Sequence, residues 1–434
     1  MLLVKWATPA LAFAAVLAVL LLVNRSAPEQ LPGVSALAGP AAQPAPQDTE
    51  SMVAALQAAV KADPADAEGY ALLGDAYYQR ARETGDATYY SRADGSYDAA
   101  LSRDPDDLTA TLGRGTLALA RHDFRGGLDL ALRARQLAPD LVRPYAVLAD
   151  AQVELGRYAA AAESLERMAT LKPTLATYSR ISYYRELDGD LPGALQAMRL
   201  AVSAGTGSAE GTAYVESLVG NLQLDRGRYG AAESAYRQAL AGDASYPAAQ
   251  AGLARIDAGR GRFAPAIRRY RRVVERIPLP EYAVGLAETE EAAGKLAAAR
   301  RDYAVVQAEV RLLHANGVNT DVDLALFEAN HGDPAQALTL ARRAWAAAPS
   351  VRSADAYSWA LYMAGRIGAA HTYSERAMRL GSRDPYFLYH AGMIARRAGA
   401  TDEARRLLAR LVGQSPRFNP LYGPRARRAL ESLR

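Results

Sequence analysis

Small and apolar residues recur with a period of about 34 along most of this chain. Each unit is marked by a small residue, a large one four positions later and another apolar residue three further on. The small residues are Ala93, Gly127, Ala161, Ala194, Ala232, Ala266, Ala299, Ala337, Ala370 and Ala404, at spacings of 34, 34, 33, 38, 34, 33, 38, 33 and 34. Only four-residue insertions before the fifth and eighth units break the period. This self-similarity predicts a repeat array.

Glycine and proline occur at fixed places within each unit. A glycine stands five residues before the small residue in most units, at Gly156, Gly189, Gly227, Gly261, Gly294, Gly332, Gly365 and Gly399. A proline often stands twelve residues after it, at Pro105, Pro139, Pro173, Pro278, Pro349 and Pro416. Glycine tolerates the positive φ that ends a helix, and proline stops a second helix because it lacks an N–H. Each unit is therefore predicted to be a helix, a tight turn and a second helix, which cross closely at the small residue.

Two units carry the pattern most clearly. The third unit has Tyr145, Leu148, Ala149, Gly156, Tyr158, Ala161, Leu165 and Pro173, and the sixth has Leu253, Ala254, Gly261, Phe263, Ala266, Tyr270 and Pro278. With these residues the chain resembles the tetratricopeptide repeat proteins, in particular uncharacterised bacterial members of membrane-anchored or secreted type. The resemblance implies an all-α, right-handed superhelical solenoid in which each unit contacts mainly its neighbours.

The pattern divides the chain into four parts. About ten repeats plus a half occupy residues 51–416, and residues 417–434 are expected to form a C-terminal capping helix with its polar face outward. Residues 26–50 hold five prolines among small and polar residues, which is typical of an unfolded linker. Residues 1–25 contain an apolar stretch that is treated next.

Residues 6–23 carry no charge and are flanked by Lys5 and Arg25. A helix of this length is about 27 Å long, close to the hydrocarbon thickness of a bilayer. The first Ala-x-Ala pattern after it ends at Ala38, later than in an ordinary cleavable signal, so we favour a retained transmembrane anchor. The distribution of Lys and Arg places the repeats outside the cytoplasm, in the periplasm or at the cell surface. The alternative is a signal peptide cleaved near Ala38, which would release a secreted protein.

Composition removes several function classes. The 434 residues include 51 basic and 47 acidic side chains, a formal charge of +4, and no cysteine. Disulfide frameworks, thiolate metal sites and cysteine nucleophiles are therefore excluded. No hydrolase, zinc-protease, dinucleotide or phosphate-loop motif is present, so we expect no catalysis and no cofactor.

Histidines and arginines offer two further kinds of site. His314 and His331 bracket Asn316, Asn319, Asp321 and Asp323, but their spacing matches no metal-ligand signature, and the loop is expected to form a turn and a helix cap. A metal or small-ligand carrier at this loop is a third alternative. The arginine run at residues 268–272 falls on a second helix, where a solvated face is favoured over a nucleic-acid footprint. No nucleic-acid partner is predicted.

The resemblance places ligand contacts on the first helix of each repeat, which lines a concave groove. Carried over unit by unit, the partner-binding positions are Asp75, Tyr78, Arg143, Asp150, Tyr183, Asn221, Arg255, Glu288, Arg352, Asp355, Trp359, Tyr362, Tyr386 and Tyr389, with His390 adjacent. The family's clamp for a C-terminal carboxylate needs a lysine that no matching position supplies. The aromatic residues of the last two repeats are typical of interface anchors, or alternatively pack between repeats.

These observations lead to two function hypotheses of different classes. The first is a membrane-tethered extracytoplasmic scaffold that binds a protein or peptide in the concave groove. The second is an accessory or assembly subunit of a membrane enzyme or of a machine that exports cell-surface polysaccharide or protein. The sequence does not identify the partner in either case.

Overall fold

The computed structural model describes residues 48–205 and 209–433. The apolar stretch at residues 6–23 and most of the linker predicted at residues 26–50 lie outside these ranges. No helix within them is both long and apolar enough to cross a bilayer.

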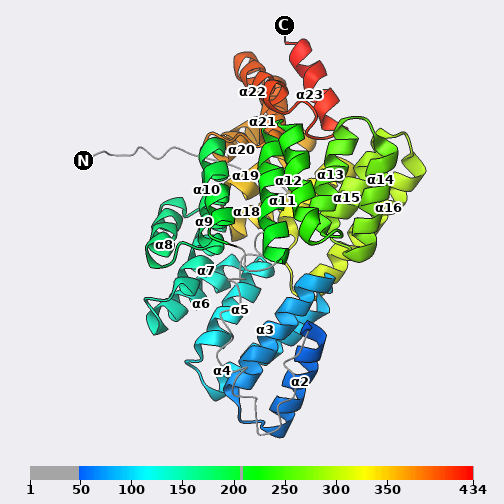
Figure 1. Cartoon of the computed structure of the whole chain (residues 1–434). Coiled ribbons are helices and arrows are strands. Elements are labelled where there is room, and N and C mark those ends of the chain that lie inside the picture. Colours follow the sequence, from blue (N-terminus) through cyan, green and yellow to red (C-terminus); the bar gives the residue numbers. More distant parts are fainter. Residues whose placement is uncertain (1–47, 206–208, 434) are drawn as a thin grey trace.

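The described residues form twenty-two helices and no strand (Figure 1). In chain order they are α2 (Thr49–Ala62), α3 (Ala67–Thr84), α4 (Thr88–Arg103), α5 (Leu108–Ala120), α6 (Phe124–Leu137), α7 (Val142–Glu154), α8 (Tyr158–Leu171), α9 (Leu175–Leu187), α10 (Leu191–Ser203), α11 (Ala209–Asp225), α12 (Tyr229–Gly242), α13 (Pro247–Gly259), α14 (Phe263–Arg276), α15 (Pro280–Ala292), α16 (Leu296–Ala315), α17 (Asp321–His331), α18 (Pro334–Ala347), α19 (Val351–Met363), α20 (Ile367–Met378), α21 (Pro385–Ala398), α22 (Thr401–Gln414) and α23 (Tyr422–Glu431).

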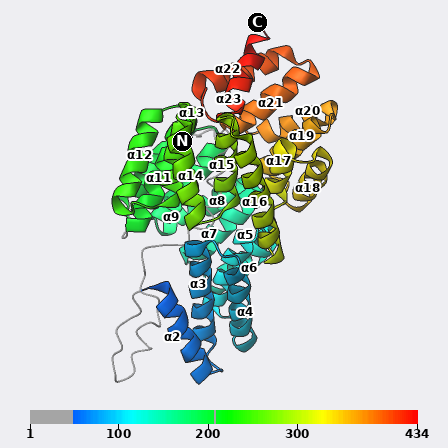
Figure 2. The same cartoon turned by 90° about the vertical axis from the view of Figure 1, so that its right-hand side faces the viewer.

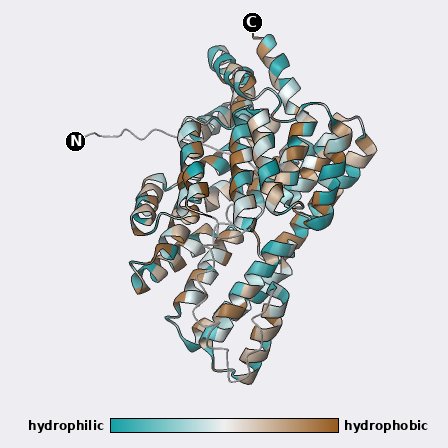
Figure 3. Ribbon diagram, viewed as in Figure 1, coloured by the Kyte–Doolittle hydropathy of each residue, from teal (hydrophilic) through white to brown (hydrophobic). Residues whose placement is uncertain are grey.

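From α3 to α22 the helices form ten consecutive pairs, which we call units 1 to 10. The first helix of each unit also contacts the first helix of a neighbouring unit, as α3 contacts α5 and α17 contacts α19. Helix α2 packs on α3, and α23 packs on α22. Apolar positions recur along the helices between polar ones, as stacking of amphipathic helices requires (Figure 3).

The small residue of each unit lies where its two helices cross, and all ten of these residues are buried. A large residue four positions later fills the space between units. The ring of Tyr97 on α4 lies against Gly74 on α3 and Gly113 on α5, and a Cβ at either glycine would overlap it. Tyr236 on α12 packs in the same way against Gly220 and Gly252. These fully buried tyrosines join three helices each, which is why glycine recurs at the facing positions.

The turns inside the units mostly follow the prediction. Positive φ angles occur at most of the predicted glycines, for example 71° at Gly156 and 69° at Gly227. His122, with φ of 57°, stands at the equivalent position of unit 2. The prediction is wrong at Gly332, where φ is −132°. There the side chain of Glu328 folds back to accept a hydrogen bond from the N–H of Asp333 (2.9 Å), so no left-handed residue is needed.

Units distant in the sequence also meet, because the array winds back on itself (Figures 1 and 2). The N–H of Asn319, before α17, donates to the carbonyl of Arg121 after α5 (2.8 Å). The N–H of Val351 donates to the hydroxyl of Tyr158 at the start of α8 (2.9 Å), and the N–H of Arg417 to that of Tyr229 at the start of α12 (3.1 Å).

In each case the turn inside an early unit receives the connection that leaves the unit five places later. Unit 2 receives the connection after unit 7, unit 3 that after unit 8, and unit 5 that after unit 10. The turn of unit 1 at Gly85 likewise faces Ile277 and Leu279, which follow unit 6. We call this row of contacts the seam. It closes the superhelix, so the first helices surround an interior instead of bordering an open groove.

The seam can be tested with two glycines that share a backbone conformation. Gly227 and Gly261 have φ of 69° and 76°, so alanine strains both by roughly 1–2 kcal/mol. A Cβ at Gly227 would also overlap the carbonyl oxygen of Gln414, whereas nothing lies within 4 Å of one at Gly261. We expect Gly227→Ala to lower the free energy of unfolding by about 1–3 kcal/mol more than Gly261→Ala, measured by chemical denaturation.

Hydrogen exchange gives a local readout of the same change. Gly227→Ala should speed exchange of the Arg417 amide, which Gly261→Ala should leave protected. Equal stability and equal exchange in the two variants would contradict docking across the seam.

Candidate functional site

Several of the predicted groove residues pair with a side chain on the first helix of the next or preceding unit. Asp150 on α7 forms a two-point ion pair with Arg180 on α9, with N–O distances of 2.9 and 2.7 Å. The same spacing of about thirty residues recurs between the first helices of other successive units. The further pairs are Glu154–Tyr183 (3.2 Å), Asp225–Arg255 (3.6 Å) and Asn330–Trp359 (2.9 Å). Asp355 and His390 extend the series at 2.8 Å. A polar ladder thus runs along the interior from unit to unit.

The remaining predicted residues divide between packing and partial exposure. The oxygens of Asp75 and Asn221 accept hydrogen bonds from the buried hydroxyls of Tyr97 and Tyr236, both at 2.7 Å. Tyr78 is buried, and burial raises its pKa to about 12. Arg143 is partly exposed and lies within electrostatic range of Asp75.

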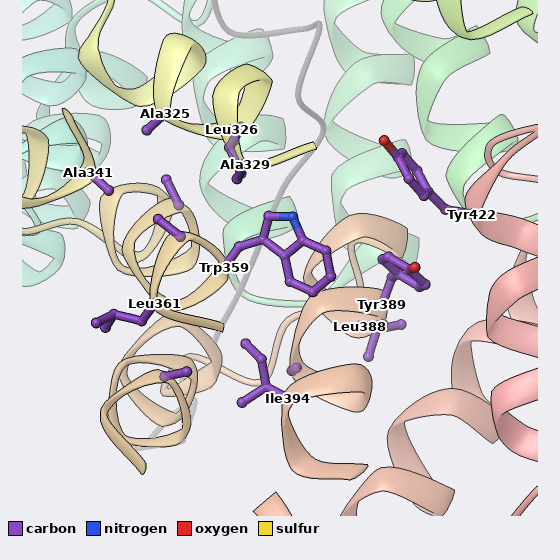
Figure 4. Close-up of a cluster of buried hydrophobic side chains, with 14 of the residues drawn as sticks. Ala325, Leu326, Ala329, Ala341, Trp359, Leu361, Leu388, Tyr389, Ile394 and Tyr422 are labelled. Carbon is purple, nitrogen blue, oxygen red and sulfur yellow. The ribbon is translucent and has the colours of Figure 1, made fainter. Parts of the chain in front are cut away.

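The predicted aromatic residues of units 9 and 10 come together in one cluster. The Trp359 indole stacks on the rings of Tyr362 and His390, with centroids 4.8 and 4.3 Å apart. Trp359 is 4% exposed and Tyr389 is 3% exposed. Figure 4 shows the indole between Ala329 and Tyr389. Burial of this kind favours the packing alternative for these two rings, while Tyr362 and Tyr386 keep some exposure.

A pocket of about 130 Å³ lies inside the superhelix, and we call it the axial pocket. Part of its lining is apolar and includes Val306, Val310 and Phe327 from α16 and α17, which we call the apolar end. Another part is polar, and we call it the polar end; it includes four predicted residues, Glu288, Arg352, Asp355 and Tyr386, together with His390. The closed superhelix thus gathers residues that are more than a hundred positions apart in the sequence.

Hydrogen bonds fix most of the polar end. Glu288 accepts from Asn419 (2.7 Å) and Tyr422 (3.2 Å) beside α23, and His331 lies 3.2 Å from it. Arg352 lies 3.7 Å from both Glu154 and Asp323. The C-terminal helix therefore contributes to the interior as well as covering the end of the array.

Several carboxyl groups in the interior are held away from water. Burial, with the nearby Asp323 and Glu309, raises the pKa of Glu281 to about 8, and burial raises that of Glu309 to about 7. Burial also raises the pKa of Asp225 to about 6, although Arg255 opposes this. Burial and the neighbouring Asp225 and Asp355 also raise the pKa of Asp384.

The sequence pattern did not predict that Glu281, Asp225 and Asp384 lie in the interior. Glu281 and Asp384 stand at the first turns of α15 and α21, where an acidic residue ordinarily signals a helix cap. Asp225 stands at the end of α11 beside the seam. A helix-cap assignment gives no indication that the closed superhelix removes these side chains from solvent.

The metal hypothesis gains no geometric support. In residues 48–205 and 209–433, no three or more His, Asp or Glu side chains are placed to bind an ion. His331 contacts Glu288 at the polar end of the axial pocket, and Asn319 accepts a hydrogen bond from the N–H of Asp321 (3.0 Å) in the turn before α17. The arginine run also behaves as surface, because Arg268 and Arg272 are exposed and Arg271 pairs with Glu290 (2.5 Å).

The raised pKa of Glu281 predicts how stability depends on pH. A carboxyl whose pKa is raised by folding holds its proton more tightly in the folded chain, so stability falls as pH rises from about 4.5 to about 8. Its buried Oε1 makes no hydrogen bond in the described residues. We expect Glu281→Gln to reduce the stability lost between pH 5 and pH 9 by on the order of 1–3 kcal/mol.

Urea denaturation at the two pH values measures this loss. Glu375→Gln, at an exposed position of α20, is the control and should behave as the unmodified chain. An equal loss in Glu281→Gln and the unmodified chain would show that Glu281 does not ionise at this cost in the folded state.

Comparison with known proteins gives a family and a general likeness of fold. Family models described as tetratricopeptide repeat match residues 147–209, 223–288 and 358–417. No curated protein matches the sequence. The structure is similar to the human IFIT1 dimer with PPP-AAAA, at 15% identity, 73% coverage of each chain and a TM-score of 0.47.

Two smaller solved proteins also align. The crystal structure of MamA covers 37% of this chain and 93% of its own, at 18% identity and a TM-score of 0.30. YrrB, described as a TPR protein with an unusual peptide-binding site, covers 45% and 96%, at 18% identity and a TM-score of 0.28. Likenesses this distant say nothing about function. The matched family segments, the 34-residue period and the ten stacked helix pairs make this chain a tetratricopeptide repeat protein.

Proposed function

We propose that this protein is a non-catalytic scaffold that binds a protein or peptide partner at the interior of its superhelix. The observation that carries the proposal is the axial pocket, to which side chains from units 1, 2, 7, 8, 9 and 10 contribute. A surface built from this many units binds a partner of complementary shape through many separate contacts. Tetratricopeptide arrays of this kind generally bind and do not catalyse.

The tether belongs to the same proposal. Residues 6–23 form a membrane anchor, and the linker at residues 26–50 carries the repeats away from the bilayer on the extracytoplasmic side. Support for this part comes from the apolar stretch and the distribution of Lys and Arg alone. Cleavage of the anchor would release the scaffold into the same compartment.

Electrostatics favours a protein partner over a nucleic acid. The human IFIT1 structures hold PPP-AAAA or m7Gppp-AAAA, but that likeness is too distant to transfer a ligand. In this chain the axial pocket is lined by two arginines and five carboxylates, namely Arg82, Arg352, Glu281, Glu288, Asp323, Asp355 and Asp384. Phosphate groups need the opposite balance.

Site-specific crosslinking in intact cells tests the proposal. A photoreactive phenylalanine analogue replaces Val322, which lines the axial pocket, or Arg143 on α7, and a matched control replaces the exposed Arg268 on α14. We expect one partner to be captured from the two interior positions and not from the control. Mass spectrometry of the product then identifies it.

Two results would decide between the alternatives. Capture only from Arg268 would place the binding surface outside and overturn the interior site. Co-purification from detergent with an enzyme in fixed stoichiometry would instead support the accessory-subunit hypothesis.

A further inference from the structure

Asp384 lines the axial pocket, and one of its carboxylate oxygens has no hydrogen-bond partner in the described residues. It lies at the N-terminus of α21, where Oδ1 accepts hydrogen bonds from the N–H groups of Tyr386 (2.7 Å) and Phe387 (2.9 Å). The residue is only 2% exposed and lines the pocket. Oδ2 forms no hydrogen bond with any residue in the described ranges. A buried polar atom left in this state is costly, so its retention calls for an explanation.

Other acidic groups face Asp384 from the helices around it. Asp355 on α19 and Asp225 on α11 interact with it electrostatically. Glu186 on α9 interacts in the same way with both Asp225 and Asp384. The nearby arginines already pair with other carboxyl groups, since Arg255 lies 3.6 Å from Asp225 and Arg352 lies 3.7 Å from both Glu154 and Asp323. This end of the pocket therefore holds more acidic than basic side chains, and Arg255 and Arg352 bind carboxyl groups other than Asp384.

The apolar end of the pocket suits a hydrocarbon. Ile277, Leu279, Val306, Val310, Leu313 and Phe327 line it. The volume of about 130 Å³ is close to that of an apolar cavity of about 150 Å³ that holds benzene. A group that fits both ends carries a short alkyl stem and a compact positive head.

We propose that the axial pocket binds a primary ammonium group on an alkyl stem, with the ammonium at Oδ2 of Asp384 and the stem against α16 and α17. A lysine side chain of the partner has this chemistry, and so does a free alkyl amine. In the first case the inference rests on the proposed scaffold function and names the side chain that the interior recognises. An ammonium, with three donors and a small radius, matches a single unpaired carboxylate oxygen better than a planar guanidinium does.

Protonation of Asp384 gives the binding a distinctive signature. Burial and the neighbouring Asp225 and Asp355 raise its pKa, so the empty pocket favours the neutral acid. A bound cation reverses this preference, and the carboxyl proton is released to solvent. Affinity should therefore rise with pH, while Glu186, Asp225 and Asp355 set the range in which it does so.

Calorimetry on the full chain in detergent tests the proposal with defined probes. The probes are n-pentylamine, the uncharged n-pentanol of similar length, a five-residue peptide with a central lysine, and the same peptide with norleucine. We expect one or both amines to bind, to release protons as judged from buffers of different ionisation enthalpy, and to exceed their neutral counterparts at least tenfold in affinity.

Matched variants connect the effect to Asp384. Asp384→Asn keeps the cap acceptor for α21 and removes the charge, and should weaken amine binding at least tenfold. Asp190→Asn makes the same change at the N-terminus of α10, where Asp190 caps Gly193 outside the pocket, and should have no effect. Val310→Phe fills the apolar end and should weaken binding without touching Asp384, so the test does not depend on one variant folding.

Each outcome has a defined meaning. Binding of the peptide alone identifies a partner lysine as the source, and binding of the free amine alone identifies a small molecule. Absence of amine binding to the unmodified chain, or equal binding by Asp384→Asn, overturns the ammonium site. If crosslinking from Val322 still captures a partner in that case, the scaffold function stands and only the cation assignment fails.

Discussion

Closure of the superhelix by the seam is the constraint on which the rest of this structure depends. An array of helix pairs held only by neighbour contacts would leave its first helices facing an open groove. Here the turns of units 1, 2, 3 and 5 meet the connections that leave the units five places later, in three of these cases through backbone groups and tyrosine hydroxyls. These contacts include the Asn319 and Val351 N–H bonds, and they convert the groove into an interior.

Enclosure changes the energetics of every polar side chain on the first helices. In an open groove, Asp150 or Asp355 would keep its hydration and be available to a ligand. In the interior each must find a partner within the protein, and the polar ladder supplies one from the next unit. A polar side chain without such a partner is energetically costly, because the interior offers it no water to bind instead. Glu281 and Asp384 are the two carboxyl groups of this kind that line the axial pocket.

Local pattern predicted the helices well because each unit is built from contacts within about 34 residues. The small residues at the crossings, the tyrosine at position 97 and the glycines after the first helices all act over that range. The all-helical repeat fold and its family followed from them. His122 shows the limit of the pattern, since a left-handed residue at a predicted glycine position only becomes apparent from backbone geometry.

The site was harder to predict because its geometry depends on the five-unit offset of the seam, which no local period contains. Carrying positions over from the family placed Glu288, Asp355 and Tyr386 on first helices but gave no indication that they would share one pocket. It left open whether Trp359 and Tyr389 anchor a partner or pack between repeats, and packing of the neighbouring helices buries both. The sequence did not identify Asp384 as a pocket residue for the same reason. An acidic residue at the start of a helix is ordinarily a cap, and its burial depends on helices distant in the sequence.

The region of the four-residue insertion before unit 8 contributes both to the seam and to the lining of the axial pocket. Four additional residues belong to the region in which α16 runs to Ala315, and the connection at residues 316–320 then reaches the turn of unit 2. That connection brings Val318 and Thr320 to the axial pocket. Just beyond it, Val322 and Asp323 line both the axial pocket and a neighbouring pocket of about 300 Å³ that Arg121 and His122 border. An irregularity in the repeat length therefore contributes one contact of the seam and part of the wall of the interior, while the other seam contacts form at connections without an insertion.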